Sequence, residues 1–474
     1  MTISIDDLPS SSVATISNSR SGFFGTDVAV AIGDVNGDGF GDFATTDRNV
    51  RVEVYNQATF SYDYGYGGVY VIFGGPGGAA SPGADIDIGS LDGSDGFVAS
   101  AIGAGGGYGE ILLSAAGDVN GDGFDDLFIA DRSGEQFSVE GEYGTYFYQE
   151  TTLYVLFGDD TGFDAVFDLA SLDPADGFEI DGPQSPEFGA AIDGGADFNG
   201  DGVADLLYVD PTEGAYGEAY VFFGEDNAVI DPALSDGLTI EGSADFRITD
   251  AAALVEDVNG DGIADLLLGD ADAGTDPVYY ANSAGAAFVL FGAIDPVGGT
   301  LSLADVAPAE GLMISAIGDD DGLGEAVAAI GDVNGDGLTD FIVTAPNADA
   351  VRSYDQAGAA YVVFGSDSGL PTDLNVGDLD GSNGFVITGD LAFRNLGATA
   401  ASIGDVNADG FDDFALSATR SFNGGDQNAV YLLFGDAAPS ANLDLAELTR
   451  SQGLAIVDDR EIEAMGVDDV NGDG

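Results

Sequence analysis

The sequence predicts an all-β fold, and within that class a seven-bladed β-propeller of four-stranded antiparallel blades with an incomplete seventh blade. An acidic loop recurs seven times, once every 60–84 residues, as expected of a repeat architecture. Four strand-like segments accompany each loop, and short antiparallel strands repeated around an axis form propeller blades. The 74 glycines and the alternation of apolar and polar residues exclude a helical solenoid.

Four segments, named A to D from the axis outward, are expected in each blade. Segment A precedes the acidic loop and is rich in small residues, which suits the crowded axis. Segment B follows the loop as an apolar run, and segment D reads Gly-apolar-x-apolar. Clear examples of A, B and D are Ala326–Ile330, Phe341–Thr344 and Gly384–Ile387.

Segment C is the most regular of the four. Its copies are VYVIFG at 69–74, LYVLFG at 153–158, AYVFFG at 219–224, AFVLFG at 287–292, AYVVFG at 360–365 and VYLLFG at 430–435. In every copy two aromatic residues stand three positions apart, as do Tyr361 and Phe364. In a strand that offset directs the two rings to opposite faces. Both faces of each sheet must then be covered, as they are when twisted sheets stack.

The two ends of the chain predict how the ring closes. A spacer with the pattern apolar-x-apolar-x-x-apolar precedes segment D, as in Leu374, Val376 and Leu379. Residues 3–8 repeat this spacer, and a D-like segment, Val13–Ile16, follows. The last residues, Ile462–Val467, read as segment A with half a loop. We therefore expect the two ends to share the seventh blade: strand D at the N-terminus and strand A at the C-terminus. Its strands B and C would lie past Gly474, in which case the chain is a fragment.

The expected division is a single propeller over residues 1–474. Its parts are blade 7 strand D at 1–20, blade 1 at 21–100, blade 2 at 101–182, blade 3 at 183–242, blade 4 at 243–316, blade 5 at 317–389, blade 6 at 390–458 and the start of blade 7 at 459–474.

Six of the acidic loops read Asp-x-Asn-x-Asp-Gly-apolar-x-Asp, and the seventh reaches only its second Asp and Gly. Oxygen donors at alternate positions are what Ca²⁺ requires, with the carbonyl of the apolar residue as a further donor. The glycine at the sixth place permits the sharp turn. The predicted Ca²⁺ ligands are Asp34, Asn36, Asp38, Phe40, Asp42, Asp118, Asn120, Asp122, Phe124, Asp126, Asp197, Asn199, Asp201, Val203, Asp205, Asp257, Asn259, Asp261, Ile263, Asp265, Asp332, Asn334, Asp336, Leu338, Asp340, Asp405, Asn407, Asp409, Phe411, Asp413, Asp469, Asn471 and Asp473.

The loops also have two other possible interpretations, an EF-hand and a turn without metal. An EF-hand needs an acid at the twelfth place, where these copies hold residues such as Thr45 and Ile129. Asp-Asn-Gly stretches also form ordinary turns without metal. Six complete copies, each with its closing Asp in register, favour metal binding over turns alone. We expect the ions to be structural and the calcium-free chain to be loosened by repulsion among its carboxylates.

Composition narrows the functions. The 85 acidic residues against 10 basic ones give a formal net charge of −75, which excludes nucleic acid and anionic membranes as partners. No Cys, His or Lys occurs, so His-activated nucleophiles, Schiff-base lysines and HExxH zinc sites are excluded. A carboxylate pair is the main catalytic scheme left open. No apolar run approaches the length of a membrane span, so no membrane insertion is expected.

At this point the chain resembles the FG-GAP repeat family, the propeller of integrin α-chains and related bacterial surface proteins. Phe24-Gly25 and Phe188-Gly189 match the FG element, whereas Phe246-Arg247 departs from it. Near matches are Tyr108-Gly109, Leu323-Gly324 and Leu396-Gly397, and Thr344-Ala345-Pro346 comes closest to the GAP element. The resemblance implies calcium in the A–B loops on one face and ligand binding on the opposite face. It favours a bacterial extracellular member over a heterodimeric integrin.

Features of that opposite face suggest a partner. The connections between segments B and C at 48–67, 133–151 and 271–285 are long and rich in tyrosine, which suits recognition of a protein or a glycan. They also read as plain extended hairpins. Asp47, Asp131, Asp210 and Asp270 end four B segments; they could bind a second cation or a sugar, or serve as turn residues. Arg48, Arg132 and Arg247 are expected to be local charge partners.

The sequence thus predicts a non-enzymatic, calcium-stabilised recognition or adhesion module, located outside the cell or on its surface. No N-terminal signal peptide is visible, so an export signal is expected beyond the C-terminus. The alternative is the propeller part of a secreted hydrolase or lyase, using carboxylates on the face opposite the calcium loops. A third and weaker possibility is an acidic scaffold for matrix or surface layers.

Overall fold

The computed structural model describes residues 2–3, 15–17, 29–56, 61–75, 85–100, 111–131, 136–141, 144–149, 151–181, 191–225, 237–249, 251–274, 284–292, 299–307, 309–316, 318, 321–349, 356–390, 395–419 and 428–458. In these ranges the chain is almost entirely β, as the sequence predicted. The helices among the described residues are the short 3₁₀ turns η3 (Ile88–Ser90), η4 (Leu169–Ser171), η5 (Val376–Asp378) and η6 (Leu445–Glu447). No helix in these ranges is long and apolar enough to cross a lipid bilayer.

The described strands form six sheets of four or five strands, numbered here in chain order. Sheet 1 contains β3 (Ala29–Gly33), β4 (Asp42–Asn56), β5 (Ser61–Ile72), β7 (Gly96–Ser100) and β13 (Val166–Asp168). Sheet 2 contains β8 (Ile111–Gly117), β9 (Asp126–Asp131), β12 (Thr152–Leu156) and β14 (Gly177–Asp181). Sheet 3 contains β15 (Ala191–Ala196), β16 (Asp205–Asp210), β17 (Glu218–Phe222), β18 (Leu238–Glu241) and β22 (Gly299–Ser302).

The other three sheets follow the same order. Sheet 4 contains β19 (Ala252–Val255), β20 (Asp265–Asp270), β21 (Ala286–Leu290), β23 (Gly311–Ser315) and β27 (Asp373–Asn375). Sheet 5 contains β24 (Val327–Gly331), β25 (Asp340–Ala345), β26 (Ala359–Val363), β28 (Gly384–Thr388) and β32 (Asn442–Asp444). Sheet 6 contains β29 (Leu396–Gly404), β30 (Asp413–Ala418), β31 (Asn428–Leu433), β33 (Gly453–Asp458) and β1 (Thr2–Ile3).

Each sheet carries the four antiparallel strands A to D in chain order, and most carry a fifth strand that the sequence did not predict. The fifth strand is the first part of a spacer, and it pairs in parallel with strand D of the preceding sheet, as β27 does with β23. Asp and Asn residues then begin the 3₁₀ turn; the Asn375 side chain accepts the N–H of Gly377. The apolar-x-apolar spacing therefore encodes a strand followed by a 3₁₀ turn.

Two pairings involve the N-terminal segment. Strand β1 runs parallel to β33, with Thr2 opposite Ala455 and Ile3 opposite Ile456. Strand β2 (Thr15–Ser17) runs parallel to β6 (Asp85–Asp87), the first part of the spacer in sheet 1. The expected A strand at Ile462–Val467 and the seventh acidic loop lie outside the described residues.

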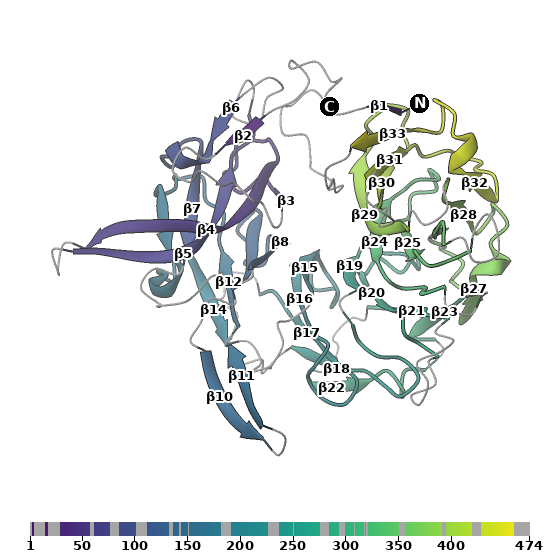
Figure 1. Cartoon of the computed structure of the whole chain (residues 1–474), viewed down its shortest axis with the longest axis horizontal. Coiled ribbons are helices and arrows are strands. Elements are labelled where there is room, and N and C mark those ends of the chain that lie inside the picture. Colours follow the sequence, from purple (N-terminus) through teal and green to yellow (C-terminus); the bar gives the residue numbers. More distant parts are fainter. Residues whose placement is uncertain are drawn as a thin grey trace.

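The sheets are arranged around a centre, with β3, β8, β15, β19, β24 and β29 innermost (Figure 1). Successive innermost strands contact one another around this arc. The arrangement is that of a β-propeller, since each sheet stands radially and presents its first strand to the axis.

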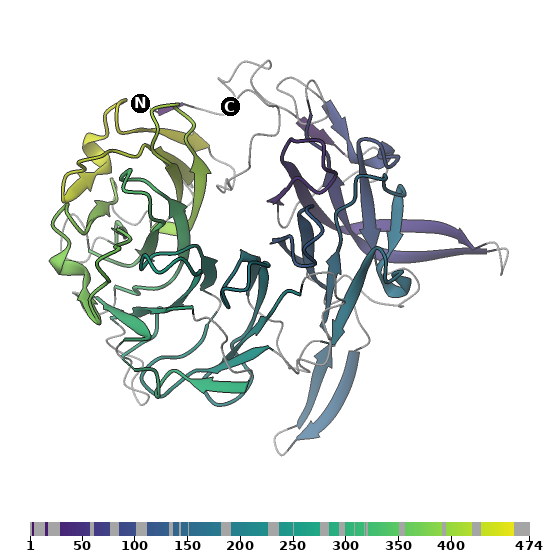
Figure 2. The same cartoon turned by 180° about the vertical axis from the view of Figure 1, so that it is seen from behind.

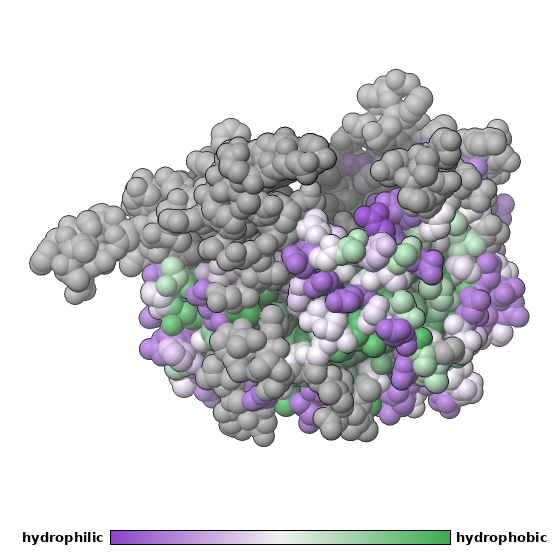
Figure 3. Space-filling view, turned by 90° about the horizontal axis from the view of Figure 1, so that it is seen from below, coloured by the Kyte–Doolittle hydropathy of each residue, from purple (hydrophilic) through white to green (hydrophobic). Residues whose placement is uncertain are grey.

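The core consists of apolar layers between neighbouring sheets. One such layer joins Phe341 and Tyr361 of sheet 5 to Leu267 and Val289 of sheet 4. The ring of Phe364, three positions after Tyr361, packs in the next layer, toward sheet 6. This confirms the prediction that the paired aromatics cover both faces of a sheet. The surface seen from below mixes hydrophilic residues with small apolar areas (Figure 3).

Two long hairpins leave the ring between strands B and C. One is the extension of β4 and β5, and the other is formed by β10 (Gln136–Gly141) and β11 (Gly144–Gln149). Both project well beyond the sheets in front and rear views (Figures 1 and 2). The predicted extended hairpins are therefore present at the first two connections. Of the third connection, 271–285, residues 275–283 lie outside the described residues.

Candidate metal centres

Each of the six described acidic loops joins strand A to strand B at the same end of its sheet. The register of the two strands shifts beside most loops, as between Ala31 and Gly33 in sheet 1. Glycines with positive φ permit the turn, for example Gly37 at 69° and Gly39 at 89°. The six complete loops therefore have one common backbone path, set by strand ends and glycines.

The first Asp of each complete loop accepts hydrogen bonds from the backbone of the turn. Its Oδ1 accepts the N–H of the second Asp and its Oδ2 accepts the N–H of the following Gly, as Asp34 does with Asp38 and Gly39 at 3.0 and 2.8 Å. The Asn36 Oδ1 accepts the same Asp38 N–H at 2.9 Å. Two acceptor oxygens of different side chains thus converge on one point. The second Asp accepts from the apolar residue, here Phe40 N–H at 3.0 Å.

The closing Asp lies buried beneath the loop. Asp42 has no exposed surface; its Oδ2 accepts Val35 N–H at 3.1 Å and its Oδ1 accepts Gly74 N–H at 2.7 Å. Gly74 ends the VYVIFG segment, so one carboxylate joins the loop to strand C. The same pair of bonds recurs in the other five loops, through Asp126 with Gly158, Asp205 with Gly224, Asp265 with Gly292, Asp340 with Gly365 and Asp413 with Gly435.

The closing carboxylates are electrostatically strained. Burial raises the pKa of Asp205 and Asp265 to about 7 and that of Asp126 and Asp340 to about 8, although backbone N–H groups oppose the shift. Repulsion from the other carboxylates of the same loop raises these pKa values further. For Asp42, whose pKa is raised to about 7 mainly by burial, the repelling groups are Asp38 and Asp34. The carboxylates of a loop therefore lie close enough for the closing Asp to be repelled by the others.

Neighbouring loops are bonded to one another. The eighth residue of one loop donates its N–H to the carbonyl of the first Asp in the preceding loop, as Asp412 N does to Asp332 O at 3.1 Å. Equivalent bonds link Asp125 to Asp34, Ala204 to Asp118, Ala264 to Asp197 and Thr339 to Asp257. At two junctions the eighth residue is itself an Asp whose side chain adds a second bond. Asp412 Oδ2 accepts Asp332 N–H at 2.8 Å, and Asp125 Oδ2 accepts Asp34 N–H at 2.8 Å.

The donor set was compared with the requirements of Ca²⁺. The described residues contain no group of three or more His, Cys, Asp or Glu side chains already set at metal-binding separation. The carboxylates of the loops bond to backbone N–H groups instead. Each carboxylate oxygen has a second lone pair, however, and an amide and a main-chain carbonyl complete the set. Hard oxygen donors at alternate positions fit Ca²⁺, and the mutual repulsion of the carboxylates favours a cation among them.

The sequence analysis did not identify two features that shape the loops. The glycine that ends segment C donates to the closing Asp in all six loops, and its constancy in the six segments was the signal available. The fourth loop position also has positive φ: Gly121 at 70°, Gly335 at 78° and Ala408 at 58°. Glycine stands at this position in five of the six loops, and Ala408 is the exception.

Other candidates have local roles. Asp210 accepts Thr212 N–H at 2.9 Å and Asp270 accepts Asp272 N–H at 3.1 Å, as turn residues do. Asp270 also accepts Arg247 N–H at 2.7 Å, and the charge of Arg247 lowers the pKa of that carboxyl against the larger effect of burial. This favours the turn interpretation of Asp210 and Asp270. The tyrosine side chains of the long hairpins and the ligands Asp469, Asn471 and Asp473 lie outside the described residues.

Comparison with known proteins identifies the repeat. The FG-GAP repeat family matches residues 323–363 and 397–433, which include the fifth and sixth loops. Over 233 residues the chain is 29% identical to Integrin alpha pat-2 of Caenorhabditis elegans, covering 48% of this chain and 17% of that protein. It is 37% identical over 112 residues to Integrin alpha-4 of Xenopus laevis, covering 24% and 10%.

A third relative, Integrin alpha-PS5 of Drosophila melanogaster, is 34% identical over 119 residues, covering 24% of this chain and 10% of that protein. The alignments with these relatives thus span only 10–17% of their length. The two matched repeats coincide with sheets 5 and 6, from the innermost strand through the loop to strand C. The chain therefore contains FG-GAP repeats at residues 323–363 and 397–433 and is similar to integrin α chains.

Proposed function

We propose that the six complete loops bind Ca²⁺ and that the chain is a recognition or adhesion module without enzymatic activity. The observation that carries the calcium proposal is the repulsion within every loop. Three carboxylates lie around each tight turn, the closing one is repelled by others of the same loop, and no loop contains a basic residue. A divalent cation relieves that repulsion, and oxygen donors are those that Ca²⁺ prefers.

The proposed ligands in each loop are the first Asp, the Asn, the second Asp, the carbonyl of the apolar residue and the closing Asp. In the first loop these are Asp34, Asn36, Asp38, Phe40 and Asp42, and the other loops follow the same positions. A bound ion would supply neutralising charge and a link between strands A and B. The chain's own residues hold the turn and fix the closing carboxylate beneath it.

We also propose seven blades with the boundaries given above. Two pairings support this: β1 lies on β33 in the position that spacer strands take on other D strands, and β2 pairs with β6 as D strands pair with the next spacer. The N-terminal segment would then contribute its spacer and strand D to the seventh blade.

The recognition face would be the one opposite the calcium loops. Strand B starts at the loop, so the B–C connections emerge at the opposite end of the sheet, where the β4–β5 and β10–β11 hairpins project. An extracellular or cell-surface location suits loops of this kind, because extracellular calcium modules bind with dissociation constants of about 10⁻⁴–10⁻³ M. The relatives are named as integrin α chains, which makes a protein ligand a natural first candidate.

Isothermal titration of the chelator-treated chain with CaCl₂ tests the calcium proposal. We expect about six ions per chain, because six loops carry the complete donor set. Asp201→Asn should remove about one ion from the stoichiometry, since an amide is a weaker ligand than a carboxylate. Asp245→Asn is the matched control: it removes the same charge from an exposed Asp outside the loops. Absence of saturable binding, or equal losses in both variants, would refute the proposal.

The recognition proposal has its own test. Binding to arrays of glycans and extracellular proteins should be lost when residues 134–149 are replaced by a short turn, because the β10–β11 hairpin is part of the proposed recognition face. Sheet 2 stays complete without this hairpin, so the variant should still fold. A chain with unchanged ligand binding would contradict the proposed face. Turnover of polysaccharides by the purified chain would instead favour the hydrolase or lyase alternative.

A further inference from the structure

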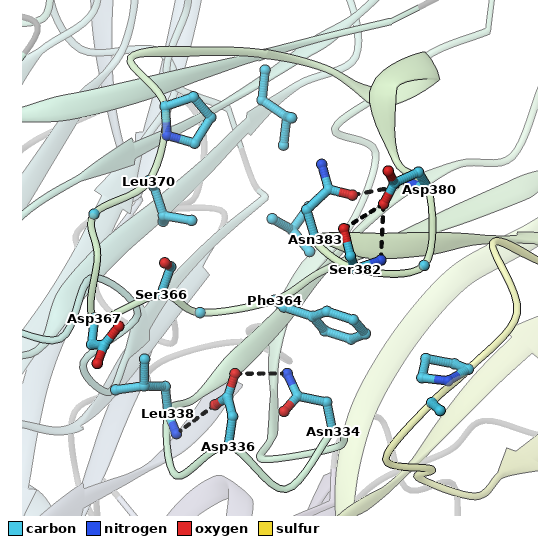
Figure 4. Close-up of a pocket in the computed structure, with 18 of the residues that line it drawn as sticks. Asn334, Asp336, Leu338, Phe364, Ser366, Asp367, Leu370, Asp380, Ser382 and Asn383 are labelled. Carbon is cyan, nitrogen blue, oxygen red and sulfur yellow. Dashed lines mark hydrogen bonds between the residues drawn. The ribbon is translucent and has the colours of Figure 1, made fainter.

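A cavity of about 1040 Å³ opens at the acidic-loop end of sheet 5, between residues of sheets 5 and 6, and Leu374 of sheet 4 also lines it. Its walls are the loop residues Asn334–Leu338, the link after β26, the turn Asp380–Asn383 before β28 and the link Ala437–Pro439 after β31 (Figure 4). Strand C ends and strand D begins at this side of the sheet, which is why two links and a turn meet the loop here. The cavity lies on the face opposite the proposed recognition hairpins.

Apolar side chains form the floor of the cavity. Phe364 is 7% exposed, and its ring lies 6.0 Å from that of Phe385 at an angle of 56°. The buried Leu374 and the half-buried Leu338 and Leu370 also line the cavity. In Figure 4 the Phe364 ring lies between the acidic loop and the Asp380 turn. The floor therefore offers aromatic and aliphatic surface to a ligand.

The rim of the cavity is acidic. Asp336, Asp367 and Asp380 line it, and no basic residue is among the lining residues. Asp380 accepts Ser382 N–H at 2.9 Å and the Ser382 hydroxyl at 2.6 Å, bonds that lower the pKa of its carboxyl and keep it ionised. Asp367 is exposed and forms no hydrogen bond with any residue that the structure describes. Negative charge on the rim thus stands over an apolar floor.

We propose that this cavity binds an arginine or lysine side chain of a basic segment in a protein partner. A cationic head would meet the carboxylates of Asp367 and Asp380, while its aliphatic stem covers Leu370 and the Phe364 ring. The volume of the cavity is similar to that of large pockets that bind small ligands in other proteins. It is large enough for a side chain and its flanking residues. Anionic ligands are excluded by the rim and by the net charge of −75.

The proposal is independent of calcium binding by the loops. Asp336 belongs both to the cavity wall and to the proposed ligand set, so the measurement is made in millimolar calcium. Under that condition Asp367 and Asp380 still provide two carboxylates to a cationic head. A chain that binds no calcium could still bind the basic segment, and a chain that binds calcium could fail to bind that segment.

The test is isothermal titration with a short peptide of sequence Gly-Arg-Pro-Leu-Arg-Gly, acetylated and amidated so that only the arginines carry charge. The comparison peptide has citrulline in place of both arginines, which preserves shape and removes charge. We expect the arginine peptide to bind at least about tenfold more tightly. Equal binding of the two peptides, or no binding of either, would overturn the proposal.

Matched variants distinguish binding in the cavity from nonspecific attraction of a cationic peptide to an acidic protein. Asp367→Asn combined with Asp380→Asn should weaken the arginine peptide about tenfold, because both changes remove charge from the rim. The asparagine at 380 can still accept the two bonds from Ser382, so the turn should keep its shape. Asp373→Asn combined with Asp378→Asn is the control: both residues are exposed, close in sequence and outside the cavity lining.

Equal weakening in the two double variants would show that long-range charge alone attracts the peptide, and would overturn the proposal. Leu370→Ala should also weaken binding, because it removes apolar surface without changing charge. A neutral oligosaccharide such as maltohexaose is the competing ligand class. Its saturable binding, abolished by Leu370→Ala and unaffected by the Asn variants, would assign the cavity to glycans instead.

Discussion

A buried carboxylate at the start of strand B can accept hydrogen bonds from the loop before it and from the end of strand C. It then links three parts of one sheet. Asp340 does so through Val333 in its loop and Gly365 at the end of strand C. The sequence analysis identified the position of this residue but assigned it only to metal. The second function was hidden because a linear pattern does not indicate that Gly365, 25 residues later, lies beside it.

The closing aspartates predict an unusual pH dependence in chelator. Their folded-state pKa values of about 7 to 8 exceed the ordinary value of 3.8, so the folded chain holds protons that the unfolded chain has lost. The free energy of unfolding is then highest at acid pH and falls as pH rises through about 7 to 8. Calorimetry should show Tm rising as the pH is lowered from about 8 to about 5.

With calcium the slope should reverse, because protons compete with the ion for the same carboxylates. The calcium-loaded chain is the internal control for this prediction. A chelated chain that loses stability on mild acidification would contradict the raised pKa values.

Ala408 predicts a stabilising substitution. It has a φ of 58° at the position where five loops carry glycine, and a left-handed conformation costs an L-residue about 1–2 kcal/mol. Ala408→Gly should therefore raise the free energy of unfolding by about 1 kcal/mol, after allowing for the greater freedom of glycine in the unfolded chain. Urea unfolding at fixed calcium measures the change.

Gly335→Ala, at the equivalent place in the fifth loop, is the reciprocal variant. Its new Cβ would lie 2.5 Å from the Phe411 ring in addition to the strain of φ 78°, so it should destabilise. If Ala408→Gly destabilised the chain, the assigned backbone conformation would be wrong.

At the level of elements, each acidic loop is a link between sheets as well as a turn within one. Phe411 from the sixth loop packs against Gly335 in the fifth, and Phe124 from the second loop packs against Gly37 in the first. The sequence analysis expected the carbonyl of this apolar residue to be a metal ligand. The structure adds contact with the neighbouring loop, which could not be predicted because it depends on how two sheets stack.

The side-chain bond across the junction of sheets 5 and 6 yields a prediction. Asp412→Ala removes the acceptor of Asp332 N–H and should cost about 1–3 kcal/mol, as expected for a hydrogen bond to a charged group. Hydrogen exchange of the peptide covering residues 331–341 should become faster in this variant, because the first Asp of that loop loses its neighbour.

Asp436→Ala is the matched control at the same junction. It removes one carboxylate but keeps the backbone bond from residue 436 to the Val333 carbonyl at 2.9 Å. Equal exchange rates in the two variants would show that the Asp412 side chain does not hold the neighbouring loop.

Across the whole molecule, the sequence predicted more of the repeat than of the connections. Strand order, the inner position of the small-residue strand and the double-sided aromatics followed from local patterns that recur six times. The parallel fifth strand did not, because a three-residue spacer strand forms only when the preceding sheet offers its D strand as an edge. The cavity between sheets 5 and 6 was equally hidden, since its residues come from segments about 100 positions apart.

The ring of sheets explains why calcium should act on global stability. Because neighbouring loops are hydrogen-bonded to one another, each proposed ion would support two sheets. At a free calcium concentration about 100-fold above its dissociation constant, a single site contributes about 2.7 kcal/mol. Even a few such sites are comparable to the total stability of about 5–15 kcal/mol that is usual for proteins.

Differential scanning calorimetry of the chain in chelator and in millimolar calcium tests this account most directly. We predict a large rise in Tm with calcium, and a smaller rise in Asp201→Asn than in its control Asp245→Asn. The same Tm in chelator and in calcium would contradict the account, because the loops would then hold their shape through backbone hydrogen bonds alone.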